Sequence, residues 1–228
     1  DPAGHYPSDS VQFEDGQSTD LFRDAAETFL SSCHPDRPFF LQVAFTAPHD
    51  PRTPPERHRL DPGAVGLPSN YLPVHPFDTG EMLVRDELLE AVPRTPEAVR
   101  GHIADYLGMV QHLDEAVGGI LDHLARLGLA DNTIVIFTAD HGIALGQHGL
   151  MGKQNLYEHS TRIPLIAAGP GIPPGIRSTE LVWHADTAAT ILLAAGVDAS
   201  AAAEGGDLRA VVSTQHHEPL RQSFAMVH

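Results

Sequence analysis

A long amphipathic segment in the middle of the chain is followed directly by a β-branched run, and this pair limits the possible folds. Across residues 95–128, apolar side chains recur every three or four positions, which predicts one long helix with an apolar face. Residues 133–138, Thr-Ile-Val-Ile-Phe-Thr, have the composition of a strand buried on both faces. Asp131 and Asn132 make the short turn between the two. A helix followed so closely by a buried strand indicates an α/β protein.

The flanking segments continue the alternation of helices and strands. Asp20 begins a helix with apolar residues at helical spacing, and residues 39–45 indicate a second buried strand. Residues 163–167 indicate a third strand, and residues 186–195 an alanine-rich helix. Such alternation predicts a largely parallel sheet flanked by helices. Residues 47–96 contain ten prolines and little periodicity, which indicates a functional loop.

Composition excludes several classes of protein. Lys and Arg number 14 against 30 Asp and Glu, and the formal net charge of −16 would repel nucleic-acid phosphates. No apolar stretch reaches the roughly 18 residues that a bilayer span needs. The single cysteine, Cys33, leaves no internal disulfide and no cysteine-based zinc site. The chain opens at Asp1 without an initiator methionine or a signal segment, so we expect a fragment or a processed piece.

Polar residues follow two of the expected strands, at the ends where open α/β sheets bind ligands. Asp140 and His141 leave the β-branched strand, and their adjacent carboxylate and imidazole are suited to bind one cation. His49 follows the other strand, and Lys153 lies in a glycine-rich loop; a proton donor and an ammonium suit an anionic substrate. On the residues alone, a turn cap at Asp140 and an ordinary polar His141 are an equally good interpretation. A lone histidine or lysine at such positions is more often structural or solvated.

These motifs, taken together and in this order, resemble a known family. Residues 131–142, 145–149, 152–153, 156–158 and 162–165 resemble the second half of a sulfatase of the alkaline-phosphatase superfamily. Residues 38–41 and 47–51 resemble the segment of the same family that carries a substrate-binding histidine. The resemblance implies an alkaline-phosphatase-like fold that is incomplete here. Residues 1–197 would form a partial catalytic domain, and residues 198–228 the start of an incomplete C-terminal region.

The resemblance also implies roles for individual residues. Asp140 and His141 would be metal ligands, His49 a contact to the sulfate or the leaving group, and Lys153 a second sulfate contact. His148, close to Lys153 in the sequence, is either a further substrate-binding residue or a surface residue. Oxygen-rich sites favour calcium, whereas an imidazole ligand favours zinc or manganese. The resemblance favours Ca²⁺ and leaves Mn²⁺ and Zn²⁺ as alternatives.

The activity implied by the resemblance is metal-dependent hydrolysis of a small-molecule or carbohydrate sulfate ester. In the family, a formylglycine made from Cys or Ser in a CxPxR motif attacks the sulfur, and we expect it in an N-terminal half that is missing here. Cys33 matches the bare pattern, but Pro38 and an expected strand follow instead of a helix, so we expect a connector. Two alternatives stay open: a phosphonate or phosphate-diester hydrolase on the same scaffold, and an inactive fragment that only binds metal or a partner.

Overall fold

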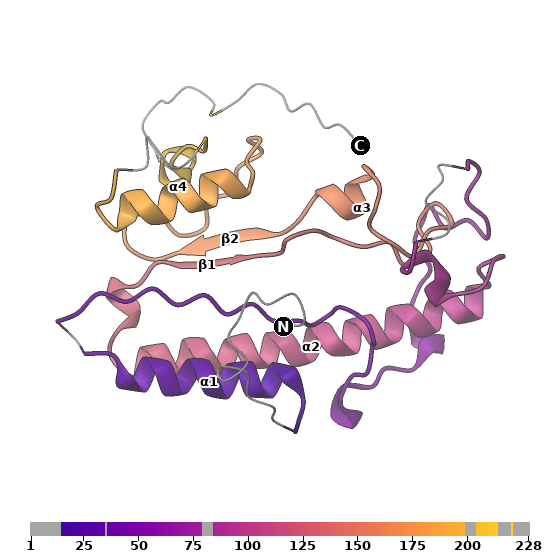
Figure 1. Cartoon of the computed structure of the whole chain (residues 1–228), viewed down its shortest axis with the longest axis horizontal. Helices are drawn as coiled ribbons and strands as arrows, with labels where there is room; N and C mark the ends of the chain where they lie inside the picture. The colour runs from indigo at the N-terminus through magenta and orange to yellow at the C-terminus, as the bar shows by residue number, and fades with distance from the viewer. Residues whose placement is uncertain (1–14, 35, 79–83, 199–203, 214–219, 221–228) are drawn as a thin grey trace, which may run out of the picture. The chain divides into compact units, whose positions relative to one another are not determined.

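The structure is a computed structural model of the chain, and it describes residues 15–34, 36–78, 84–198, 204–213 and 220. Its helices and strands in chain order are α1 (Ser18–Ser32), α2 (Pro96–Arg126), β1 (Val135–Thr138), α3 (Glu158–Thr161), β2 (Leu165–Ala168), α4 (His184–Ala194) and α5 (Leu208–Val211) (Figure 1). Single turns of 3₁₀ helix span Glu56–His58, Pro62–Ala64, Glu87–Leu89 and Ala130–Asn132. Among the described residues, no helix is both long and apolar enough to cross a bilayer.

The chain divides into two compact units. The first combines Asp1–Gly66 with Arg100–Leu129, and the second combines Leu67–Val99 with Ala130–His228. The expected C-terminal region, residues 198–228, lies largely outside the described residues. The geometry of the expected site is therefore described separately for each unit, from contacts between residues of the same unit.

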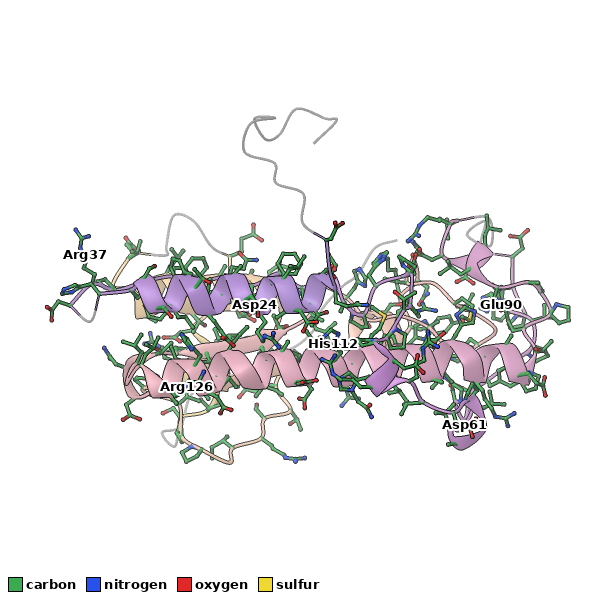
Figure 2. All side chains as sticks on the ribbon, turned by 90° about the horizontal axis from the view of Figure 1, so that it is seen from below. Asp24, Arg37, Asp61, Glu90, His112 and Arg126 are labelled. Carbon is green, nitrogen blue, oxygen red and sulfur yellow. The ribbon has the colours of Figure 1, made fainter. Side chains whose placement is uncertain are left out.

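In the first unit, α1 and α2 lie side by side and run in the same direction (Figures 1 and 2). His112 Nε2 donates a hydrogen bond to Asp20 Oδ1 at 2.9 Å. Nearer the C-terminal ends of the same two helices, His123 Nε2 donates to Ser31 Oγ at 2.8 Å. Both pairs are 92 positions apart in the sequence, so the two helices keep one register. Figure 2 shows His112 between the helices, and its side chain is 3% exposed. Polar side chains thus connect the facing sides of α1 and α2.

The strand expected at residues 39–45 is not formed among the described residues. The segment alternates between half-buried and exposed side chains, as a strand does. Its inward side packs on α1, with the ring of Phe45 6.0 Å from that of Phe22, and Phe39 6.2 Å from Phe29. Its outward side is open, and Phe40 is 65% exposed. The apolar run predicted a strand buried on both faces, and this is wrong on two counts: one side is exposed, and none of the described residues supplies the hydrogen-bonded partner that a strand needs.

In the second unit, β1 and β2 form a two-stranded antiparallel sheet. Val135 pairs with Ala168 and Thr138 with Leu165. The expectation of a largely parallel sheet is therefore not met by the strands that the structure describes. Parallel neighbours need a long crossover, usually a helix, whereas α3 is the one helix between β1 and β2 and has only four residues. The chain instead folds back after β1, and both strands lie close to their predicted positions.

Candidate functional site

The end of β1 carries an aspartate and a histidine that face each other. The backbone N–H of His141 donates to Asp140 Oδ1 at 3.0 Å, and His141 Nε2 lies 3.3 Å from Asp140 Oδ2. On the other side of the ring, His141 Nδ1 donates to the carbonyl of Gly142 at 2.9 Å. In a neutral imidazole whose Nδ1 carries the proton, Nε2 presents a lone pair. Two lone-pair atoms this close to each other need a positive charge between them or a proton on the ring.

This donor pair fits a divalent cation as part of its coordination sphere. A carboxylate oxygen and an imidazole nitrogen are metal ligands, and a metal-bound histidine commonly donates its other N–H to a backbone carbonyl. The Asp140 side chain is 86% exposed, so it is accessible to an ion. Within the described ranges, no cluster of three or more His, Cys, Asp or Glu side chains is placed to hold an ion. Asp140 and His141 are therefore a partial ligand set.

Gly142 fixes the loop that carries these two residues. Its N–H donates to the carbonyl of Ser160 in α3 at 2.9 Å. A Cβ at this position would collide with the carbonyl oxygen of His159, so the contact requires a glycine. Thr138 at the end of β1 donates from Oγ1 to the carbonyl of Pro164 at 2.9 Å. Residues 139–141 are thus held on both sides, by the hydrogen bonds of Thr138 and Gly142, which orients Asp140 and His141.

The loop that carries Lys153 runs beside this segment. The N–H of Ala144 donates to the carbonyl of Gly152 at 2.9 Å, and that of Gly146 donates to the carbonyl of Leu150 at 2.8 Å. These bonds place Gly152, which precedes Lys153, next to Ala144 in the segment that follows His141. Lys153 is the single lysine in the sequence; the other 13 of the 14 Lys and Arg residues are arginines. Its Nζ lies 3.7 Å from Oδ2 of Asp86, a partner that sequence reasoning missed.

His148 lies in a cluster of aromatic rings in the second unit. Its ring stacks on Tyr157 with centroids 4.2 Å apart, and its carbonyl accepts a hydrogen bond from His75 Nδ1 at 2.7 Å. Its backbone has φ of 55°, a left-handed conformation that is uncommon for a residue other than glycine. The side-chain amide of Asn70 donates to His148 Nε2 at 3.0 Å. The ring therefore has protein partners of its own, and its substrate-binding role stays a prediction.

His159, on α3, belongs to the same cluster. Its ring lies 5.5 Å from Tyr157 and 6.0 Å from His148. Its Nε2 is buried and has no hydrogen-bond partner in the part of the chain that the structure describes. Burial, and then the charge of His148, lower the pKa of His159 to about 4. The imidazole is therefore neutral at pH 7.

The two remaining sequence candidates lie in the first unit. His49 Nδ1 donates to the carbonyl of Asp50 at 2.9 Å and lies 3.2 Å from Oδ1 of the same residue. Convergence of His49 on the residues of the second unit stays a prediction. Cys33 ends α1, and its N–H donates to the carbonyl of Leu30. The C-terminal end of a helix carries partial negative charge and does not favour a developing oxyanion. That Cys33 is a connector and not the nucleophile stays a prediction.

Comparison with known proteins decides the family. A model of the sulfatase family matches residues 2–197. The chain belongs to the sulfatase family. A choline-sulfatase of Rhizobium meliloti is 35% identical over 169 residues, which cover 71% of this chain and 32% of that enzyme. This sulfatase chain thus spans about a third of the length of that relative.

Solved structures confirm the alkaline-phosphatase-like α/β fold. The structure of BT4656 in complex with its substrate D-glucosamine-2-N,6-O-disulfate has a TM-score of 0.74 and 26% identity, and the match covers 88% of this chain and 53% of that one. A phosphonate monoester hydrolase of Silicibacter pomeroyi has the same TM-score of 0.74 at 25% identity, covering 90% of this chain and 43% of that one. Each match extends over most of this chain and about half of the other, so the fold is partial here, as expected.

Proposed function

We propose that this sulfatase chain carries part of the active site of a metal-dependent sulfate-ester hydrolase. One observation carries the proposal: His141 Nε2 and Asp140 Oδ2 face each other at 3.3 Å, while Nδ1 of the same ring is committed to the Gly142 carbonyl. This arrangement supports a cation at the end of β1. Membership of the sulfatase family supports the reaction class.

The proposed ion is Ca²⁺, with Mn²⁺ and Zn²⁺ as alternatives that also accept an imidazole ligand. A bound divalent ion withdraws electron density from a sulfate oxygen. Asp140 contributes a negatively charged oxygen ligand. His141 contributes Nε2, and the hydrogen bond to Gly142 keeps its ring in the tautomer that leaves Nε2 unprotonated.

Lys153 and His49 are proposed to handle the anionic group and the leaving alcohol. A protein of net charge −16 repels a sulfate ester, so a local ammonium is needed to bind its oxygens. Lys153 is the one lysine that this chain offers for the purpose. His49 would donate a proton to the departing oxygen or bind the sulfate. His148 would line the substrate site.

Carbohydrate and small-molecule sulfate esters are the proposed substrates. BT4656 binds a sulfated glucosamine, and the relative in Rhizobium meliloti is a choline-sulfatase. The chain covers 53% of BT4656 and 32% of the choline-sulfatase, so the activity is assigned to the full-length polypeptide that carries these residues. We place the formylglycine nucleophile outside these residues and propose that the 228-residue chain alone is inactive.

Turnover of 4-nitrophenyl sulfate by the full-length polypeptide, loaded with Ca²⁺ or Mn²⁺, tests the proposal. We expect His49→Ala to lower kcat/KM by about 100-fold, which is the range for loss of a general acid. Arg59→Ala is the matched control in the same loop region, because Arg59 is 65% exposed and its ion pair in the described part of the chain is with Glu56, on its own turn. Turnover of His49→Ala within a few-fold of the wild type would contradict the assignment of His49.

A phosphonate or phosphate-diester hydrolase is the second candidate. The observation in its favour is the match to the phosphonate monoester hydrolase, which is as good in TM-score as the match to BT4656. Parallel assays with 4-nitrophenyl sulfate and 4-nitrophenyl phenylphosphonate separate the two. A larger kcat/KM for the phosphonate with both metals would replace the sulfatase proposal by this one.

A further inference from the structure

The backbone just before Lys153 is held by one buried carboxylate. The N–H of Met151 donates to Glu87 Oε2 at 2.9 Å, and the N–H of Gly152 donates to Glu87 Oε1 at 2.8 Å. Both oxygens of Glu87 are thus bound to consecutive amides. The Glu87 side chain is 4% exposed and Met151 is fully buried, so these hydrogen bonds are shielded from water.

Arg94 holds that carboxylate in turn. Its Nη2 donates to Glu87 Oε2 at 2.8 Å and to the backbone carbonyl of Glu87 at 2.7 Å. Arg94 is itself completely buried, and its own N–H donates to the carbonyl of Pro73 at 2.7 Å. Tyr71 donates from its hydroxyl to the Arg94 carbonyl. Arg94 therefore fixes both the side chain and the backbone of Glu87.

Asp86 carries the arrangement on to the Lys153 side chain. Its carboxylate is 3% exposed; Oδ2 accepts a hydrogen bond from Gln154 Nε2 at 3.0 Å and lies 3.7 Å from Lys153 Nζ. Its Oδ1 pairs with Arg85 Nη2 at 2.9 Å. Two consecutive carboxylates thus contact three consecutive residues: Glu87 binds the backbone amides of residues 151 and 152, and Asp86 lies against the ammonium of Lys153.

We propose that Asp86 and Glu87, braced by Arg94, are positioning residues that set the direction of the Lys153 ammonium. Glu87 fixes where the lysine leaves the backbone, and Asp86 fixes where its long, flexible side chain ends. The inference rests on the proposed function, because a single ammonium must be placed accurately to bind a sulfate oxygen. It adds three residues that act through Lys153 and touch no substrate.

We call Asp86, Glu87 and Arg94 together the clamp, and they leave no room for a side chain at Gly152. A Cβ on Gly152 would lie 2.8 Å from Glu87 Oε1 and 3.3 Å from Asp86 Cβ. Because Glu87 is bound on both oxygens, it has no freedom to move aside. The clamp therefore also requires the glycine that precedes Lys153.

Reactivity of the Lys153 amine tests this directly, because no other lysine competes. We would acetylate the folded 228-residue chain with N-acetoxysuccinimide and follow the Lys153 peptide by mass spectrometry, resolved from the α-amino group. We expect D86N and E87Q each to raise the acetylation rate at least about 3-fold, since a held, paired amine is freed. E97Q, at an exposed position in the first turn of α2, is the matched control and should react at the wild-type rate.

The two variants protect the test against misfolding. E87Q leaves the buried Arg94 without its counter-charge and can unfold the loop, whereas D86N keeps the shape of its side chain and leaves Glu87 and Arg94 intact. Circular dichroism identifies which variants fold. Folded D86N with Lys153 reactivity equal to that of E97Q would overturn the proposal, because a purely structural carboxylate changes thermal stability and not the environment of the amine.

Failure of the proposed function gives a different result. If D86N and E87Q change the reactivity of Lys153 while K153A keeps sulfate-ester turnover in the full-length polypeptide, the clamp is upheld and the role of Lys153 is wrong. If K153A abolishes turnover while both clamp variants leave amine reactivity and kcat unchanged, the clamp is wrong and the role of Lys153 is upheld.

Discussion

His141 turns its Nε2 toward the Asp140 carboxylate because its Nδ1 donates to the carbonyl of Gly142, the next residue along the chain. A local backbone acceptor thus selects the face of the imidazole that an ion would meet. The same short segment is held to α3 through Gly142 and Ser160. The geometry of the expected metal site therefore depends on a glycine as much as on its two ligands.

Replacing Gly142 by alanine should destabilise the second unit. The new Cβ would collide with the carbonyl oxygen of His159, which is backbone and has nowhere to move. We expect a loss of about 2 kcal/mol in the free energy of unfolding, measured by urea titration. Gly101→Ala is the control: nothing lies within 4 Å of its Cβ position on α2, and helix propensity predicts a gain of about 0.5–1 kcal/mol. Equal effects of the two substitutions would contradict this account of Gly142.

The pair between Asp20 and His112 should make the first unit sensitive to acid. Burial raises the pKa of Asp20, but the hydrogen bond and charge of His112, together with the charges of Arg23 and Arg57, lower it by more. The pKa of Asp20 therefore lies below its usual value. A carboxyl whose pKa is depressed on folding contributes stability above its unfolded pKa, which is lost as pH falls through the folded pKa. Asp20→Asn should cost about 1 kcal/mol at pH 7 and progressively less below pH 4. Urea unfolding of this variant at several pH values measures the effect.

Asp105→Asn provides the comparison for Asp20, because Asp105 is exposed on the same helix α2 as His112. It should leave stability nearly unchanged at both ends of the pH range. An Asp20→Asn penalty that is as large at pH 3 as at pH 7 would show that the loss is one of packing and not of charge.

His159 should titrate far below an ordinary histidine. Its pKa is lowered to about 4, first by burial and then by the charge of His148. The unfolded chain then binds more protons than the folded one between about pH 4 and 6.5, so stability falls as pH drops through this window. NMR of the imidazole carbons, assigned with His159→Asn, measures the midpoint directly. A midpoint near 6.5 would show that the ring is solvated.

The sequence predicted the elements whose pattern is local. Helical spacing predicted α2 over 95–128, and the β-branched run predicted β1, because periodicity within a segment reports which face is buried. Residues 39–45 show where this fails: their nearly continuous apolar run predicted a strand buried on both faces, but whether a partner strand and a second layer cover them depends on residues far away. The antiparallel direction of β1 and β2 was likewise set by how the intervening loop folds, which periodicity does not report.

The site was predictable to the same extent. The strand end with Asp140 and His141, and the glycine-rich loop with Lys153, carry signals in short motifs. Glu87 and Arg94 lie in a region rich in prolines without periodicity, and Glu87 meets the 151–152 amides across 64 and 65 positions of sequence. An Arg-Asp-Glu run there has the pattern of a solvated surface. The burial of Asp86 and Glu87 against the loop that carries Lys153 became visible only in the folded structure.

A metal site at the end of β1 predicts how the full-length polypeptide carrying Asp140→Asn turns over 4-nitrophenyl sulfate. Loss of a charged metal ligand should lower kcat by at least about 1,000-fold at saturating Ca²⁺, because the substitution removes part of the coordination sphere. Asp131→Asn, an exposed carboxylate before β1, should keep wild-type turnover. Turnover of Asp140→Asn within a few-fold of the Asp131→Asn value, with the same dependence on Ca²⁺, would contradict a metal site at the end of β1.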